Sequence, residues 1–145
     1  MSGPYREHMK VALVGCGGIA GFHVAALRYA GFTVDAVCGR PGSKHAYSFA
    51  REQEVERVYD SYDDLLNDYA EYDAFVIAVT PESTPRILRA SMRLGVPILV
   101  EKPVSLRSEN VRSIVREFSD ASTSVIVGFN RRFYRTTSLA KQYVN

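Results

Sequence analysis

The sequence predicts an α/β fold in which helices cover both faces of a mainly parallel, doubly wound sheet of about six strands. Short apolar runs alternate along the chain with stretches of helical length, the pattern of repeated strand–helix–strand units. The run at 74–79, Ala-Phe-Val-Ile-Ala-Val, is apolar throughout, as expected for a strand buried on both faces of a parallel sheet. The 145 residues, 46% hydrophobic and 23% charged, are typical of one globular domain.

The first half of the chain is expected to hold three strands and three helices. The expected strands are 10–14, 33–38 and 57–59, and the expected helices are 18–30, 44–53 and 61–69. Four apolar residues of the first helix follow helical spacing, namely Ile19, Phe22, Ala26 and Tyr29. Gly31 stops that helix, and Ser43 is a candidate N-cap for the next one. Ser61 followed by Asp63 and Asp64 is typical of a helix start.

The second half repeats the alternation. The expected strands are 74–79, 96–100 and 124–129, and the expected helices are 84–94, 107–118 and a last one from about 136. Gly95 ends the first of these helices. Residues 1–8 lack periodicity and are expected to be a flexible tail. We therefore divide the chain into that tail, one domain at 9–130, and a final segment at 131–145.

Composition excludes several function classes. The net charge of +2 is too small to predict nucleic-acid binding. Basic residues outnumber acidic ones after residue 80, which indicates either solvated helix faces or contact with an acidic or phosphorylated ligand. The uncharged run at 11–27 is broken by four glycines, so it does not predict a membrane span. Cys16 and Cys38 lack metal-ligand spacing, and their small number favours a reducing, cytoplasmic compartment.

A glycine-rich turn joins the first strand to the first helix. It matches G-x-G-x-x-A, the fingerprint of dinucleotide-binding Rossmann domains, in the required strand–turn–helix context. Its candidate cofactor-binding residues are Gly15, Gly17, Gly18, Ile19 and Ala20. A pyrophosphate would meet free N–H groups at the helix start. The turn also resembles the glycine loop of S-adenosylmethionine methyltransferases, but those carry an acidic residue where this chain has Leu13.

The end of the second strand bears on the choice between NAD and NADP. A site that prefers NAD has a carboxylate there to accept hydrogen bonds from the ribose. Asp35 has the right count from Gly15 but lies inside the strand, and the strand end reads Gly39-Arg40, followed by Ser43 and Lys44. A guanidinium suits a 2′-phosphate, so we predict NADP over NAD, with Gly39, Arg40, Ser43 and Lys44 as candidate cofactor-binding residues. The alternative is that Arg40 lies beside the adenine or faces water.

Three later segments follow the ends of the fourth, fifth and sixth expected strands. They are Val79-Thr80-Pro81, Glu101-Lys102-Pro103 and Gly128-Phe129-Asn130-Arg131-Arg132-Phe133. Doubly wound folds bind ligands at this edge of the sheet. Together with the glycine turn, these motifs resemble the glucose-fructose oxidoreductase, inositol dehydrogenase and rhizopine-catabolism family (Gfo/Idh/MocA). The resemblance spans about residues 9–143.

The resemblance implies an NAD(P)-dependent oxidoreductase that acts on sugars, cyclitols or their derivatives. It implies that Lys102 is the catalytic residue beside the nicotinamide and the reacting hydroxyl, where an ammonium would stabilise a developing alkoxide. It assigns the remaining cofactor contacts to Thr80, Pro81, Glu101, Asn130 and Arg132. The family often has Asn and His where this chain has Glu82 and Pro85, a difference expected near the nicotinamide.

The family continues into a second α/β domain that covers the substrate and supplies an Asp and a His, and residues 131–145 resemble the crossover to it. His8, His23 and His45 do not fit the role of that histidine. We therefore expect this chain to bind its cofactor, to turn over poorly, and to take a sugar-like substrate only when a second domain is supplied. The alternatives are a truncated dehydrogenase and a stand-alone binding module, either a redox sensor or a subunit of a split enzyme. Phe129, Phe133 and Tyr134 are candidates for a homo-oligomer contact.

Overall fold

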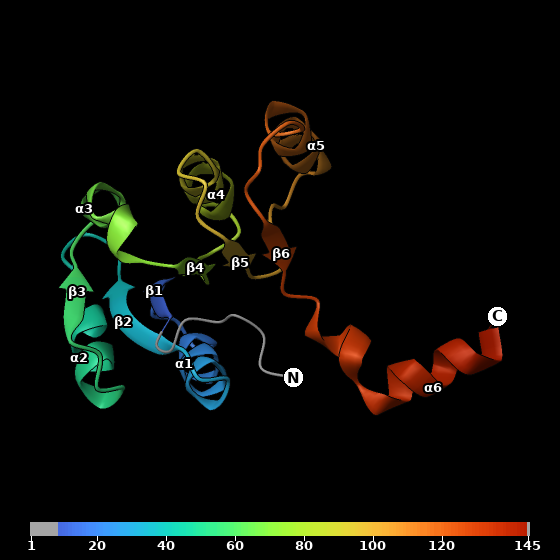
Figure 1. The fold of residues 1–145 in the computed structure, drawn as a ribbon, viewed down its shortest axis with the longest axis horizontal. Coiled ribbons are helices and arrows are strands. Elements are labelled where there is room, and N and C mark those ends of the chain that lie inside the picture. The colour runs from blue at the N-terminus through green and yellow to red at the C-terminus, as the bar shows by residue number, and fades with distance from the viewer. Residues whose placement is uncertain (1–8, 145) are drawn as a thin grey trace.

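The computed structural model describes residues 9–144, so the expected tail at 1–8 lies outside the described residues. Strands and helices alternate along the whole described chain (Figure 1). The strands are β1 (Lys10–Val14), β2 (Thr33–Cys38), β3 (Arg57–Tyr59), β4 (Ala74–Ile77), β5 (Ile98–Val100) and β6 (Val125–Val127). The α-helices are α1 (Ala20–Tyr29), α2 (Lys44–Glu52), α3 (Tyr62–Asn67), α4 (Thr84–Met92), α5 (Ser108–Glu117) and α6 (Arg135–Val144). Two short 3₁₀ helices are η1 (Tyr69–Glu71) and η2 (Asn130–Phe133).

The six strands form one parallel sheet in the order β3-β2-β1-β4-β5-β6. The predicted doubly wound Rossmann fold is thereby confirmed. Strand order reverses between β1 and β4, because the chain first builds outward on one side and then returns to the centre and builds on the other. Ligands of such sheets bind at the carboxyl ends of the strands beside this switch point.

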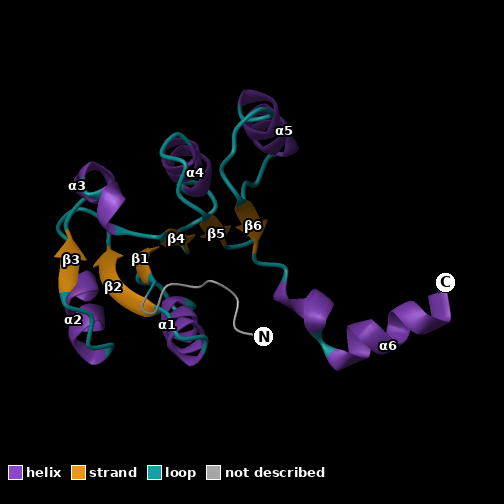
Figure 2. Cartoon of the chain, in the orientation of Figure 1, coloured by secondary structure: helices purple, strands orange, loops and turns teal. Residues whose placement is uncertain are grey.

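Helices cover both faces of the sheet (Figure 2). One face packs against α1 and α2, through a core that includes Val24 and Phe49. The other face packs against α3, α4 and α5, with Phe75 and Leu65 fully buried between the sheet and these helices. The uninterrupted apolar run of β4 is thus explained by burial on both sides, as predicted.

The face that α1 turns to the sheet differs from the one suggested by apolar spacing. Ile19, Phe22 and Tyr29 are exposed, and the helix packs instead through Ala20 and Val24, both fully buried. The glycine turn brings the start of α1 close to the strands, and only a small residue fits at that contact. The larger apolar side chains of the helix therefore lie on its outer surface.

Of the two predicted helix caps, only one forms a capping hydrogen bond through its side chain. Ser61 Oγ accepts a hydrogen bond from the Asp64 backbone N–H at 3.1 Å and caps α3 as expected. Ser43 occupies the N-cap position of α2 but makes no capping hydrogen bond through its side chain. Its hydroxyl instead lies beside Gly39, in a region described below.

The last helix, α6, extends away from the sheet (Figure 2). The aromatic side chains that lead into it are largely exposed, with Phe129, Phe133 and Tyr134 at 58%, 74% and 52%. Among residues 9–144, no helix has both the length and the apolarity needed to cross a membrane.

Candidate cofactor site

The glycine turn after β1 is wedged between the ends of its two neighbouring strands. Gly15 has φ +103°, and its N–H donates to the Cys38 carbonyl at 2.8 Å. A Cβ on Gly15 would lie 2.3 Å from the Ala78 carbonyl oxygen, which belongs to the backbone and cannot move aside. Both the conformation and the contact therefore require glycine, as the motif predicts.

Gly17 has a different environment. A Cβ there would meet nothing within 4 Å, so the protein itself does not require a glycine at this position. The Gly17 carbonyl accepts a hydrogen bond from the Ala20 N–H at 2.9 Å, which starts α1. No acidic side chain lies in the first turn of α1, and no side chain caps it. The helix start is thus open to an anion, as a pyrophosphate site requires.

A cavity of about 420 Å³ opens beside the turn, at the switch point of the sheet. Six of the predicted cofactor residues line it: Gly15, Gly17, Gly39, Arg40, Ser43 and Thr80. They come from the ends of β1, β2 and β4. Other predicted residues of the same segments do not line it, namely Gly18, Ile19, Ala20, Lys44 and Pro81. We call this cavity the adenosine cavity, because it is lined by Gly39, Arg40 and Ser43, from the segment predicted to lie beside the 2′-phosphate of the adenosine group.

The adenosine cavity contains side chains that the sequence motifs did not identify. Arg86 of α4 and Asp63 of α3 line it together with Arg40. His45 of α2 also lines it, and its Nε2 lies 2.8 Å from the Cys16 carbonyl oxygen of the glycine turn. All three missed residues lie in the first turn of a helix that follows a strand. Their position in the sequence could have identified them, because the first turns of helices that follow strands meet at the carboxyl edge of a parallel sheet.

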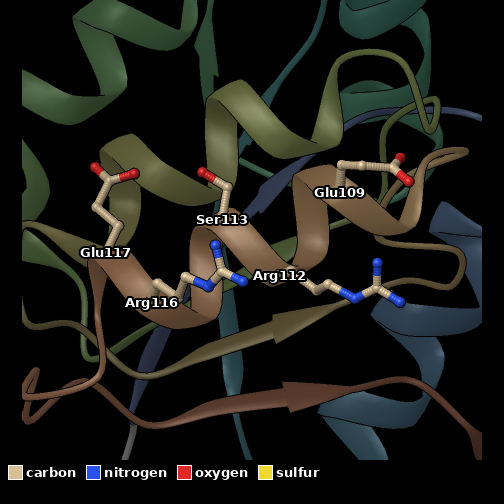
Figure 3. A pocket seen from close by; sticks show the side chains of 5 residues that line it. All are labelled: Glu109, Arg112, Ser113, Arg116 and Glu117. Carbon is tan, nitrogen blue, oxygen red and sulfur yellow. The ribbon is translucent and has the colours of Figure 1, made fainter.

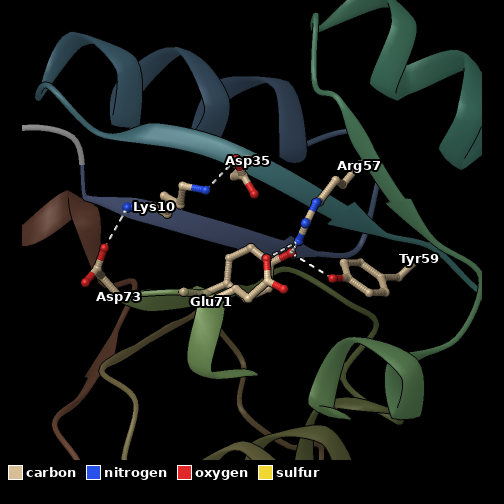
Figure 4. A network of polar contacts seen from close by, with 7 residues as sticks. Lys10, Asp35, Arg57, Tyr59, Glu71 and Asp73 are labelled. Carbon is tan, nitrogen blue, oxygen red and sulfur yellow. Dashed lines mark hydrogen bonds and ion pairs between the residues drawn. The ribbon is translucent and has the colours of Figure 1, made fainter. Parts of the chain in front are cut away.

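Asp35 lies away from this cavity, as its position inside β2 predicted. Its Oδ1 is 3.5 Å from Lys10 Nζ, at the start of β1 (Figure 4). The pairing of β1 with β2 is irregular here: Val34 pairs with Val11 and Ala36 pairs with Ala12, so Asp35 is left without a partner residue across the strands. In Figure 4, Lys10, Arg57 and Asp73 lie at or just before the amino ends of β1, β3 and β4, whereas Tyr59 is the last residue of β3. The acid that counting from the glycines selects therefore lies outside this cavity.

The two cysteines lie under the adenosine cavity. Both are free and buried, with Cys16 7% and Cys38 1% exposed. Burial raises the pKa of the Cys16 thiol to about 11 and that of the Cys38 thiol to about 12. Protonated thiols are poor nucleophiles, so these residues suit a cavity floor rather than chemistry. The described residues also contain no cluster of potential metal ligands.

A second cavity, of about 560 Å³, lies at the ends of β5 and β6. It brings Lys102, the predicted catalytic residue, together with Asn130 and Arg132, and we call it the Lys102 cavity. The Arg132 guanidinium lies over the Phe133 ring, 4.8 Å from its centroid. Glu101 does not line this cavity. Its Oε1 is 3.0 Å from Nε2 of His23, on α1.

A third hollow lies on the outer surface of α5 (Figure 3). It is lined by Glu109, Arg112, Ser113, Arg116 and Glu117. Glu117 pairs with Arg89 of α4 and with Arg93 at the C-cap of that helix, and Arg89 also donates to Ser113. These contacts hold α4 and α5 together. None of the predicted site residues lies here.

Comparison with known proteins identifies the family. The family described as "Oxidoreductase family, NAD-binding Rossmann fold" matches residues 9–129. The chain belongs to this family. It is 35% identical over 128 residues to inositol 2-dehydrogenase 2 of Saccharopolyspora erythraea, covering 86% of this chain and 37% of that protein. It is 32% identical over 143 residues to scyllo-inositol 2-dehydrogenase (NAD(+)) of Bacillus subtilis, covering 96% and 41%.

A solved structure shares the fold. An oxidoreductase from Agrobacterium radiobacter, in complex with NAD+, L-tartaric acid and magnesium, superimposes with a TM-score of 0.79 at 26% identity. The match covers 86% of this chain and 36% of that one. This family member thus spans about two fifths of the length of the relatives it matches.

Proposed function

We propose that this chain binds a nicotinamide dinucleotide along the carboxyl edge of its sheet and forms the cofactor half of an oxidoreductase. The observation that carries the proposal is the glycine turn at the switch point. Gly15 is required by the fold, whereas Gly17 leaves an open approach to an uncapped helix start beside a 420 Å³ cavity. This arrangement fits a pyrophosphate with an adenosine group on one side.

The two cavities suggest how the cofactor lies. The adenosine group would occupy the adenosine cavity, and the nicotinamide would extend past Thr80 and Pro81 toward Lys102. Gly18, Ile19 and Ala20 would hold the helix start against the phosphates through the backbone. We propose NADP as the preferred cofactor, because Arg40 and Ser43 line the cavity at the end of β2 while Asp35 is paired elsewhere.

The proposed reaction is hydride transfer between the nicotinamide and a hydroxyl-bearing carbon of a sugar- or cyclitol-like compound. The bound nicotinamide supplies the redox chemistry. Lys102 would hold the reacting oxygen and stabilise negative charge on it, with Asn130 and Arg132 beside it. Two relatives named as inositol dehydrogenases support the cyclitol class.

We propose further that these residues alone turn over slowly. Lys102, Phe129, Asn130, Arg131, Arg132 and Thr137 line the Lys102 cavity. Among the described residues, no carboxylate or imidazole lines it, so Lys102 has no neighbour there with which to exchange the proton of the reacting hydroxyl.

A fluorescence titration tests cofactor binding. We expect NADPH and NADH to bind the purified chain, NADPH more tightly, and Gly17→Ala to weaken both. A steady-state assay with myo-inositol and each oxidised cofactor then tests the slow turnover. Absence of binding by both cofactors would refute the proposal, and tighter binding of NADH would refute the NADP preference.

A further inference from the structure

A histidine–carboxylate pair joins two distant parts of the carboxyl edge. His23 Nε2 lies 3.0 Å from Glu101 Oε1, although 78 residues separate the two in sequence. Both side chains are mostly buried, at 14% and 18% exposure. An ionised carboxylate only accepts hydrogen bonds, so Nε2 carries the hydrogen. The pair therefore ties α1, which begins at the glycine turn, to the end of β5, which carries Lys102.

The second carboxylate oxygen of Glu101 also has a protein donor. The backbone N–H of Lys102 donates to Glu101 Oε2 at 3.0 Å. The Glu101 N–H donates to the Ile77 carbonyl at 2.8 Å, which anchors the same residue to β4. One side chain thus fixes the backbone at which Lys102 leaves the sheet.

Gly128, at the end of β6, packs close to the same carboxylate. A Cβ on Gly128 would lie 3.3 Å from Glu101 Oε1 and 3.4 Å from its Cδ. Gly128 N–H also donates to the Val100 carbonyl at 2.8 Å. The carboxylate is therefore enclosed by groups from α1, β5 and β6, with little freedom to rotate.

We propose that His23 is a positioning residue for the nicotinamide half of the cofactor. By holding Glu101, it fixes the Lys102 backbone and the end of β5 where the nicotinamide would lie; this rests on the proposed dinucleotide binding. The family resemblance implies that Glu101 contacts the ribose directly. The structure adds that each oxygen of its carboxylate already has a protein donor, so the side chain also acts through the backbone that it holds.

The proposal predicts an effect confined to one half of the ligand. The adenosine cavity is lined by neither His23 nor Glu101. Replacing His23 by Leu should therefore weaken NADPH binding about tenfold and leave the affinity for 2′-phospho-ADP, which lacks both the nicotinamide and its ribose, within twofold. The nicotinamide fluorescence of bound NADPH should also move toward that of the free cofactor, which a purely structural role would not cause. His23→Gln, whose amide can donate near the position of Nε2, should restore part of the NADPH affinity.

Two further variants serve as controls. Gly128→Ala approaches the same carboxylate from β6 and should reproduce the NADPH-specific loss without altering α1. Phe22→Ala, next to His23 on α1 but 73% exposed, should change neither affinity. Urea unfolding of each variant checks that it is folded. If the His23→Leu protein does not fold, the Gly128→Ala protein tests the proposal instead.

The outcomes separate the two proposals. Equal weakening of both ligands in the His23→Leu and Gly128→Ala proteins, or of neither, would overturn the positioning role. If the unmodified chain binds neither NADPH nor 2′-phospho-ADP, the proposed function fails, and the positioning role fails with it. If the unmodified chain binds both and only NADPH is weakened, both proposals are supported.

Discussion

The two cavities at the carboxyl edge of the sheet differ in how far the surrounding residues bury them. The adenosine cavity lies among buried groups, with Cys16, Cys38 and Ala78 at its walls at most 8% exposed. The Lys102 cavity is bordered by Phe129, which is 58% exposed. The first half is therefore shaped by the packing of the described residues. The second half has its polar groups in place, but its surroundings are open.

The position of the strands in the sheet explains the difference. The adenosine cavity lies at the ends of central strands, where helices pack on both faces. The Lys102 cavity lies at β5 and the edge strand β6, where α4 and α5 cover one face (Figure 1). On β6, Ile126 remains 54% exposed. Rigidity of the first half should therefore come from packing, whereas rigidity of the second should depend on single contacts such as the His23–Glu101 pair.

The largest expected effect is a loss of stability caused by substitution in the glycine turn of the adenosine half. Gly15→Ala should lower the free energy of unfolding by about 3 kcal/mol, because it adds left-handed strain and a contact with the Ala78 carbonyl. Gly17→Ala is the matched control and should change that free energy by less than about 0.5 kcal/mol, while weakening NADPH binding about tenfold. Urea unfolding and fluorescence titration measure the two quantities. Equal destabilisation by the two changes would contradict this account.

Alkaline pH should also weaken the adenosine half. The folded thiols of Cys16 and Cys38 have pKa values of about 11 and 12, raised by burial from the ordinary 9.0. Above pH 9 the unfolded chain loses protons that the folded chain retains, so stability falls as pH rises. The two thiols together should lower the free energy of unfolding by about 2 kcal/mol between pH 9 and pH 10. Urea titrations in reductant measure this, and a Cys16→Ala, Cys38→Ala protein should show a smaller slope than the unmodified chain.

A smaller effect concerns the choice of cofactor within the same half. Arg40→Ala should weaken NADPH binding about tenfold, since it removes a charged hydrogen-bond donor from the 2′-phosphate, and should leave NADH within twofold. Lys44→Ala, which removes a neighbouring charge outside the adenosine cavity, is the control and should leave both affinities within twofold. Paired titrations decide it. A loss of NADH affinity as large as that of NADPH would place Arg40 at the adenine instead.

The smallest expected effect falls outside both halves. Asp35→Asn should leave the affinities for NADH and NADPH unchanged, because its partner Lys10 lies at the amino end of β1. Lys10 is 48% exposed, so screening should limit the loss of unfolding free energy to less than about 1 kcal/mol. Titration and urea unfolding of one variant measure both. A marked loss of NADH affinity alone would restore Asp35 as the ribose acid.

Periodicity predicted the fold well, and the motif residues meet at the switch point of the sheet. The six predicted strands are present, and six of the predicted cofactor residues share the adenosine cavity. Prediction from sequence was weaker where the same local pattern is compatible with more than one packing arrangement. Apolar spacing in α1 suggested a packing face through Phe22 and Tyr29, but the close approach set by the glycine turn selected Ala20 and Val24. Motifs also missed Arg86 and Asp63, because neither is part of a local pattern.

The sequence by itself determined the parallel sheet, the glycine turn and the edge where a ligand would lie, since these follow from local periodicity and from residues that lie close together along the chain. Only the tertiary structure decided which polar groups meet. It turned Asp35 toward Lys10, brought His45 to the turn, and joined His23 to Glu101 across 78 positions. The physical reason is that a hydrogen bond depends on the separation of two atoms in space. For residues far apart in sequence, that separation is set by the order of the strands and the packing of the helices on them.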